Sequence, residues 1–113
     1  LKVSPYMFHD LAAVGQWSKE AAQKVSPLTV EQITSANEAL AGFDFRKDLY
    51  RITAKTLVIS GEHDELNPPK AGRETARLIP NATFVEFNES GHAPNVEQHF
   101  LFLDFVLEFF DVK

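Results

Sequence analysis

The apolar positions divide the chain into a helical first part and an alternating second part. A stripe of apolar residues at helical spacing follows residue 29, and it consists of Val30, Ile33, Ala36 and Leu40. Thr29 precedes this stripe, and Gln32 lies three positions after Thr29. Gly42 lies two positions after Leu40, the last residue of the stripe. This order is typical of a helix with an N-terminal capping box and a C-terminal glycine stop. A second, earlier helix is predicted over residues 8–24.

Beyond residue 42 the pattern changes to strand, helix, strand, helix. Residues 56–59 form a short, continuous apolar run, which is typical of a strand buried in a parallel sheet. A helix is predicted over residues 69–79, with Asn67 as its expected N-terminal cap. The prolines that follow Asn67 fit this start, because proline is tolerated in a first helical turn. A second strand is predicted over residues 83–87 and a last helix over residues 96–110. The alternation indicates an α/β fold with parallel strands.

Two features indicate that this α/β unit needs partners. Two strands cannot make a parallel sheet with both faces covered, so further strands are expected outside this sequence. In the last helix, only Asp104 and Glu108 between Phe100 and Phe110 are not apolar. Such a helix is expected to be buried on most of its circumference, and 113 residues offer little surface for that. We therefore expect a fragment, or a chain that is completed by another chain or by a second copy.

Composition excludes several classes of function. The chain has 113 residues, a net charge of −5 and no cysteine. The acidic balance without a basic run argues against nucleic acid as a partner, and the missing cysteines exclude disulfides and thiolate metal sites. No apolar stretch reaches about 18 residues, so no membrane span is expected. The start at Leu1 shows no signal-peptide pattern, which favours the cytoplasm. The four scattered histidines predict no metal site, and no cofactor is expected.

The candidate chemistry lies just after the two predicted strands. Asp64 follows the first strand and His92 follows the second. The carboxyl ends of neighbouring parallel strands meet at one edge of a sheet, so these two side chains are expected to lie together. A carboxylate on one imidazole nitrogen fixes the tautomer and leaves the other nitrogen free to take a proton from a nucleophile. The order Asp before His matches the last two members of a Ser, Asp, His series.

These motifs resemble the C-terminal portion of the α/β-hydrolase family of serine hydrolases. The resemblance rests on Thr56–Glu65, Pro68, Ile79–Ala82, Gly91–Pro94, Glu97, Phe100 and the apolar C-terminal helix. It implies that Asp64 is the acid and His92 the general base of a catalytic triad. It also implies that residues 1–42 are a helical cap remnant and residues 43–113 the C-terminal part of the hydrolase core. The implied activity is hydrolysis of a small ester or amide, without a cofactor.

The nucleophile that the resemblance implies is missing from the sequence. The family carries its serine in Gly-x-Ser-x-Gly, and none of the six serines here has glycines at that spacing. A chain without a nucleophile has no acyl-transfer pathway of its own, so we expect the missing N-terminal part or a second chain to supply it. The segment around Asp64 and the apolar C-terminal helix look similar to members of the proline-iminopeptidase type. Esterases and C–C bond hydrolases share nearly the same signature, so the type of hydrolase stays open.

Three other interpretations remain open from the sequence alone. The chain could be a catalytically inactive α/β-hydrolase fragment that acts as a binding or oligomerisation module. It could also be one half of a two-chain enzyme that is cut within the cap. Finally, the chain could have an unrelated small α/β fold, which would leave Asp64 and His92 far apart. Within the hydrolase interpretation, Glu65 is a weaker alternative to Asp64 as the acid.

Overall fold

The computed structural model describes residues 8–12, 15, 19–20, 23–24 and 26–112 of the chain. Its elements are, in order, α3 (Val30–Leu40), η1 (Leu49–Arg51), β1 (Thr56–Gly61), α4 (Pro69–Leu78), β2 (Ala82–Phe87), α5 (Pro94–Glu97) and α6 (His99–Phe109). The predicted α/β class is confirmed, and both predicted strands are present with slightly wider bounds. Seven of the 17 positions of the helix predicted over residues 8–24 lie outside the described residues.

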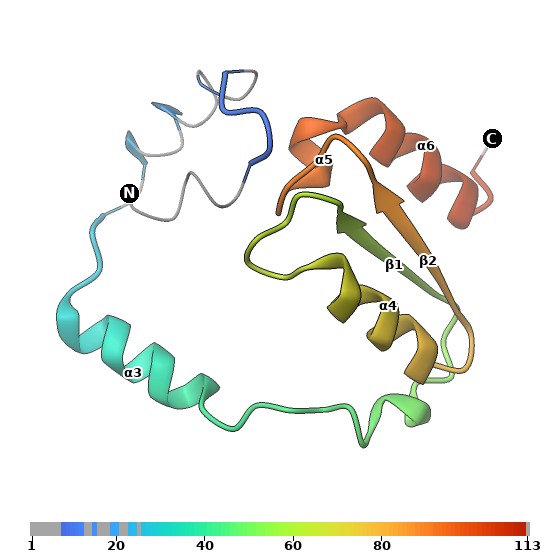
Figure 1. Cartoon of the computed structure of the whole chain (residues 1–113), viewed down its shortest axis with the longest axis horizontal. Coiled ribbons are helices and arrows are strands. Elements are labelled where there is room, and N and C mark those ends of the chain that lie inside the picture. Colours follow the sequence, from blue (N-terminus) through green and yellow to red (C-terminus); the bar gives the residue numbers. More distant parts are fainter. Residues whose placement is uncertain (1–7, 13–14, 16–18, 21–22, 25, 113) are drawn as a thin grey trace.

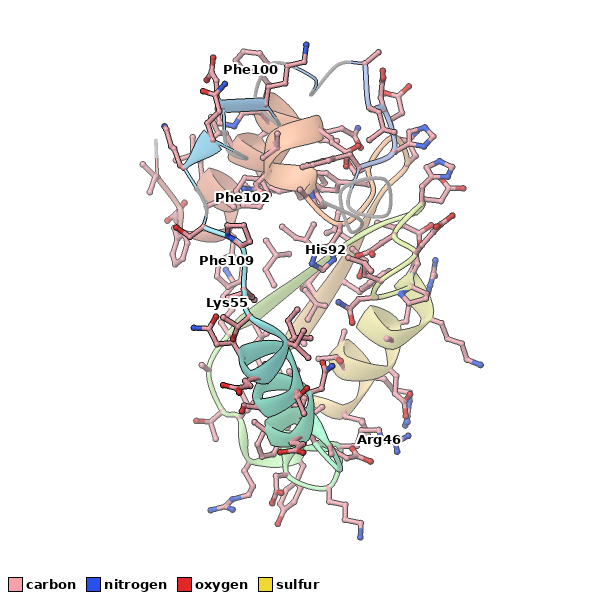
Figure 2. The ribbon with its side chains drawn as sticks, turned by 90° about the vertical axis from the view of Figure 1, so that its left-hand side faces the viewer. Arg46, Lys55, His92, Phe100, Phe102 and Phe109 are labelled. Atoms are coloured by element: carbon pink, nitrogen blue, oxygen red, sulfur yellow. The ribbon has the colours of Figure 1, made fainter. Side chains whose placement is uncertain are left out.

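The two strands form a parallel sheet with helices on both sides. Their register runs from Thr56 beside Ala82 to Gly61 beside Phe87. Helix α4 connects the strands and lies against one side of the sheet, whereas α6 lies on the other side (Figures 1 and 2). Within the described part of the chain, β1 pairs only with β2. The second edge of β1 therefore presents unpaired backbone groups to its surroundings.

Helix α4 packs closely on the sheet because of a glycine. A Cβ atom on Gly72 would lie 2.2 Å from the Ser60 hydroxyl oxygen and 3.0 Å from the Phe84 ring. Only a residue without a side chain allows this approach. The helix begins after Pro68, which has no side-chain cap. The predicted cap at Asn67 is therefore wrong, and the Asn67 backbone N–H instead donates to the Asp64 carboxylate at 2.9 Å.

The last helix is interrupted, which corrects the prediction of one helix over residues 96–110. Gln98 has φ −125° and ψ 55°, and it separates the short α5 from α6. Its side-chain oxygen accepts hydrogen bonds from the Ser90 hydroxyl at 2.7 Å and from the Glu89 backbone N–H at 3.0 Å. These hydrogen bonds to the preceding loop offset the helical hydrogen bonds that are lost at the interruption. The spacing of apolar residues along the sequence gives no sign of them.

Helix α6 half-buries one side and leaves an apolar side open. Inward, the Phe105 ring lies 5.6 Å from the ring of Phe87, which is fully buried. The Lys55 ammonium donates to the Phe109 carbonyl at 3.1 Å and lies 4.6 Å from the Phe109 ring centroid (Figure 2). Outward, apolar side chains stay exposed, and these are Phe100, Leu101, Leu103, Leu107 and Phe110.

The described part of the chain contains no helix with the length and apolarity that crossing a membrane requires.

Helix α3 forms as its sequence predicts but has no buried residue. The predicted capping box is confirmed: the Gln32 backbone N–H donates to the Thr29 hydroxyl, and the Gln32 side chain accepts from the Thr29 backbone N–H. Every residue of α3 is exposed, including Val30 and Leu40 of its apolar stripe. The helix stands apart from the sheet (Figure 1). A boundary near residue 42 between a cap remnant and the core stays a prediction.

Candidate active site

The site begins where backbone hydrogen bonds continue past the ends of both strands. Glu62 N–H donates to the Phe87 carbonyl at 2.9 Å, and His63 N–H donates to the Ser90 carbonyl at 3.0 Å. Gly61 makes this approach possible, because a Cβ atom there would lie 2.0 Å from the Gly91 carbonyl oxygen. The loop after β1 and the loop after β2 are therefore joined along their backbones.

Asp64 is a buried carboxylate with partners on both oxygens. Its residue is 8% exposed. Oδ1 accepts hydrogen bonds from the backbone N–H groups of Leu66 and Asn67, both at 2.9 Å. Oδ2 lies 3.0 Å from Nδ1 of His92. Backbone donors fix the orientation of the carboxylate, so that its second oxygen faces the imidazole.

His92 presents its other nitrogen to the surroundings. Its side chain is 36% exposed, whereas that of Asp64 is 7% exposed. With Oδ2 of Asp64 as acceptor, Nδ1 carries the proton and Nε2 is left with a lone pair. His92 lies at the carboxyl end of the sheet, between β2 and α5 (Figure 2). The arrangement is that of a general base with a carboxylate behind it.

The structure distinguishes Asp64 from its acidic neighbours. Glu62 and Glu65 are both exposed, and His92 is bonded to Asp64 instead. The 3.0 Å separation of Asp64 and His92 also contradicts the unrelated-fold interpretation, which required them to lie far apart. Both predicted site residues are therefore brought together by the parallel strand pair.

Sequence reasoning missed the residues that support the His92 loop. Glu97 accepts a hydrogen bond from the Gly91 N–H at 2.6 Å, and Gln98 binds Glu89 and Ser90 as described above. Ser90 is fully buried. The available signal was an acidic and an amide side chain about one helical turn after Gly-His, close enough to reach back to the loop.

An open hollow of about 320 Å³ lies beside the Asp64–His92 pair. Its lining comes from β1, α4 and the two loops, and includes Val58, Ser60, Asn67, Thr75, His92 and Pro94. On the other side of the loop, the rings of His9 and His63 stack with centroids 3.8 Å apart. Among the residues that the structure describes, no three His, Asp or Glu side chains are grouped so that they could hold a metal ion.

Comparison with known proteins identifies relatives of one kind. A family model described as alpha/beta hydrolase fold matches residues 4–98. A proline iminopeptidase, PfmaB of Pestalotiopsis fici, is 41% identical over 57 residues, which are 50% of this chain and 20% of that protein. A pimeloyl-[acyl-carrier protein] methyl ester esterase of Legionella pneumophila is 31% identical over 84 residues, which are 74% of this chain and 35% of the esterase.

Solved structures agree with these relatives. The enol-lactonase from Burkholderia xenovorans LB400 superimposes with a TM-score of 0.78 at 30% identity. The match covers 97% of this chain and 43% of the lactonase. The chain thus spans 20% to 35% of the length of the curated relatives named above and less than half of this solved structure.

Proposed function

The chain belongs to the α/β-hydrolase fold family, and from this premise we propose that it supplies the acid and the base of a serine-type hydrolase acting on a small ester or amide. One observation carries the proposal: Nδ1 of His92 lies 3.0 Å from Oδ2 of a buried Asp64. In this proposal Asp64 is the acid and His92 the general base.

The proposed mechanism assigns one proton path to each step. Nε2 of His92 takes the proton of a serine hydroxyl as its oxygen attacks the substrate carbonyl carbon. The Asp64 carboxylate stabilises the resulting imidazolium through Nδ1–H. The imidazolium then gives the proton to the leaving alcohol or amine as the acyl-enzyme forms. Water attacks the acyl-enzyme with His92 again as the base. The bond between the acyl group and the serine oxygen then breaks, the imidazolium returns its proton to that oxygen, and the acid product leaves.

The serine of this mechanism comes from outside residues 1–113. No Gly-x-Ser-x-Gly occurs in the sequence. The hollow beside His92 is lined by residues of β1 and by none of β2, and β1 also has an unpaired edge, which supports the addition of further sheet there. A parallel strand that ends beside Gly61 would bring a nucleophile on its following turn towards Nε2 of His92.

The names of the relatives favour a substrate with an ester or amide carbonyl. One is an esterase of a methyl ester, one an enol-lactonase and one a proline iminopeptidase. Two of these three names describe the cleavage of an ester-type C–O bond. We therefore place esters first among the proposed substrates, with the N-terminal amide bond of a peptide second.

The decisive experiment identifies a reactive serine in the protein as its cells make it. The protein is captured with an antibody against residues 56–112, treated with a fluorophosphonate probe and analysed by intact-mass and peptide mapping. We expect the probe on a serine in Gly-x-Ser-x-Gly, either in a longer chain or in a second polypeptide. Hydrolysis of p-nitrophenyl acetate should accompany the labelling.

Variants connect that activity to the described pair. Asp64→Asn should lower kcat by about 10³- to 10⁴-fold, because the amide donates to Nδ1 and favours the wrong imidazole tautomer. His92→Gln should abolish labelling, since no base remains. Glu108→Gln on exposed α6 serves as the matched acidic control and should keep full activity. Absence of a labelled serine in the captured protein would reject the proposed function.

The open side of α6 favours a second candidate, an assembly module without catalysis. Phe100 and Phe110 are 82% and 67% exposed, and such a surface associates readily in water. A groove of about 420 Å³ between β1 and α6 adds to this apolar side. Sedimentation of the 113-residue chain would show a stable dimer in this case, and the captured protein would lack a probe-reactive serine.

A further inference from the structure

One carboxylate joins the His92 loop to a segment more than 80 positions away. Oε2 of Glu97 accepts a hydrogen bond from the Gly91 N–H at 2.6 Å. Oε1 accepts from the backbone N–H groups of His9 and Asp10, the latter at 3.1 Å. We refer to this set of three hydrogen bonds as the Glu97 bridge. It ties residues 9–10 directly to the residue that precedes His92.

Apolar side chains also connect residues 8–10 to the His92 loop. Phe8 is only 6% exposed and packs with Ala93, the residue that follows His92, and with Val96 of α5. The described segment at residues 8–10 therefore contacts the His92 loop both before and after the histidine. Any displacement of that segment acts on the backbone that sets the direction of the imidazole.

The chemistry of the bridge requires a carboxylate. A carboxylate is an acceptor on both oxygens and makes charge-assisted bonds with three N–H donors at once. A glutamine has nearly the same shape but one acceptor oxygen, so its NH₂ group would face at least one backbone N–H. Gly91 or residues 9–10 would then lose their partner, whichever way the amide is turned.

We propose that Glu97 is a positioning residue that holds the His92 loop in register with Asp64 and makes that register depend on the docking of residues 8–10. The inference rests on the proposed function, because positioning matters only where His92 is the base. It gives the upstream segment a direct role in setting the imidazole tautomer.

The test measures the imidazole of His92 by NMR in the whole protein that contains residues 1–113, with no assay of activity. Nitrogen-15 shifts of the ring at about pH 8, above the usual imidazole pKa, report which nitrogen carries the proton. In the unmodified chain we expect the Nδ1–H form. Glu97→Gln should shift His92 towards the Nε2–H form and speed amide exchange at Gly91 about tenfold or more. Glu89→Gln removes an equal charge from the same loop and should change neither.

Each result decides the matter. Faster exchange at Gly91 with an unchanged His92 tautomer would make Glu97 a structural contact only and would overturn the proposal. Should Glu97→Gln fail to fold, Phe8→Ala decides, because it keeps the carboxylate and loosens the docked segment. It should accelerate exchange at His9 and Asp10 and shift the His92 tautomer part of the way, and a shift in exchange alone would again overturn the proposal.

The same spectra separate this inference from the proposed function. An Nε2–H form in the unmodified chain would contradict the Asp64–His92 pairing, and both proposals would fail together. An Nδ1–H form that Glu97→Gln leaves in place would remove only the positioning role. A bridge that behaves as expected, in a captured protein without a reactive serine, would leave the positioning result intact and reject the hydrolase.

Discussion

Helix α3 and the two loops that follow β1 and β2 are ordered by different kinds of contact. Helix α3 is regular, with a complete capping box, and none of its residues is buried. The loops have little regular structure, yet they contain buried Asp64 and fully buried Ser90. Order in α3 comes from neighbours in sequence, whereas order in the loops comes from bonds to residues far along the chain.

This difference teaches where a mutation should act. In α3 the contacts that matter are between Thr29 and Gln32, three positions apart. At the loops, a single side chain such as Glu97 of α5 binds the backbone of two separate segments, at residues 9–10 and at Gly91. Damage in α3 should stay local, and damage in the loops should spread to the sheet and to the acid–base pair.

The largest effect is expected for Phe87→Ala. This fully buried ring joins β2 to α6, and its removal should cost about 3–5 kcal/mol of the free energy of unfolding. Leu40→Ala in α3 removes a side chain that is 63% exposed and should cost less than about 0.5 kcal/mol. Urea unfolding followed by circular dichroism measures both. Equal losses would remove the contrast between the two regions.

Gly61→Ala is expected to come next. Its Cβ atom would lie 2.4 Å from the Ser90 carbonyl oxygen and closer still to the Gly91 carbonyl oxygen. Both oxygens belong to the backbone, which cannot move aside as the end of a flexible side chain can. We expect a loss of about 3 kcal/mol in the free energy of unfolding, together with the loss of the Asp64–His92 hydrogen bond. Gly15→Ala is the matched control, because nothing lies within 4 Å of its Cβ position. Unfolding curves of both variants, with the His92 imidazole spectrum, test this expectation.

Thr29→Ala should act on α3 alone. Loss of the hydroxyl acceptor should destabilise the helix by about 1 kcal/mol, which matters for an isolated helix of 11 residues. Backbone chemical shifts of residues 30–40 should move towards coil values, while those of residues 56–99 should not change. A response in the Asp64–His92 region would show that α3 is coupled to the sheet after all.

The smallest effect is expected at the surface pair between the two regions. A side-chain hydrogen bond from Arg46 lowers the pKa of Asp44 to about 2. Since the folded value is below the unfolded one, any stabilisation is present above about pH 4 and is lost as the pH falls towards 2. The pair is fully exposed, so the unfolding midpoint at neutral pH should not change in Arg46→Gln. Carboxyl carbon NMR should show the Asp44 midpoint returning to near 3.8 in that variant.

The sequence predicted what depends on near neighbours. The capping box of α3, the two strands, and the placement of Asp64 and His92 at the strand ends all follow from local patterns together with the rule for parallel sheets. The pairing of Asp64 with His92 was predictable because both lie directly after strands, where topology leaves little freedom.

The features that the sequence did not predict depend on hydrogen bonds between side chains and the loops. Gln98 lies inside a continuous apolar periodicity, and only its bonds to residues 89 and 90 explain the break between α5 and α6. Asn67 has the right type for a cap, but the helix begins after Pro68, and the Asn67 N–H donates to Asp64. The sequence assigned no contact to Glu97, because its partners are backbone N–H groups of residues 9, 10 and 91.

The separation of Asp64 and His92 along the chain has a kinetic consequence. The two residues are only 28 positions apart, and α4 and β2 fill the interval between them. The entropy lost on closing such a loop is modest and grows slowly with its length. The acid–base pair therefore assembles at the rate at which a single crossover folds. On a ribosome, the residues that form and support the pair are complete once Gln98 has been added, because its side chain binds the loop before His92.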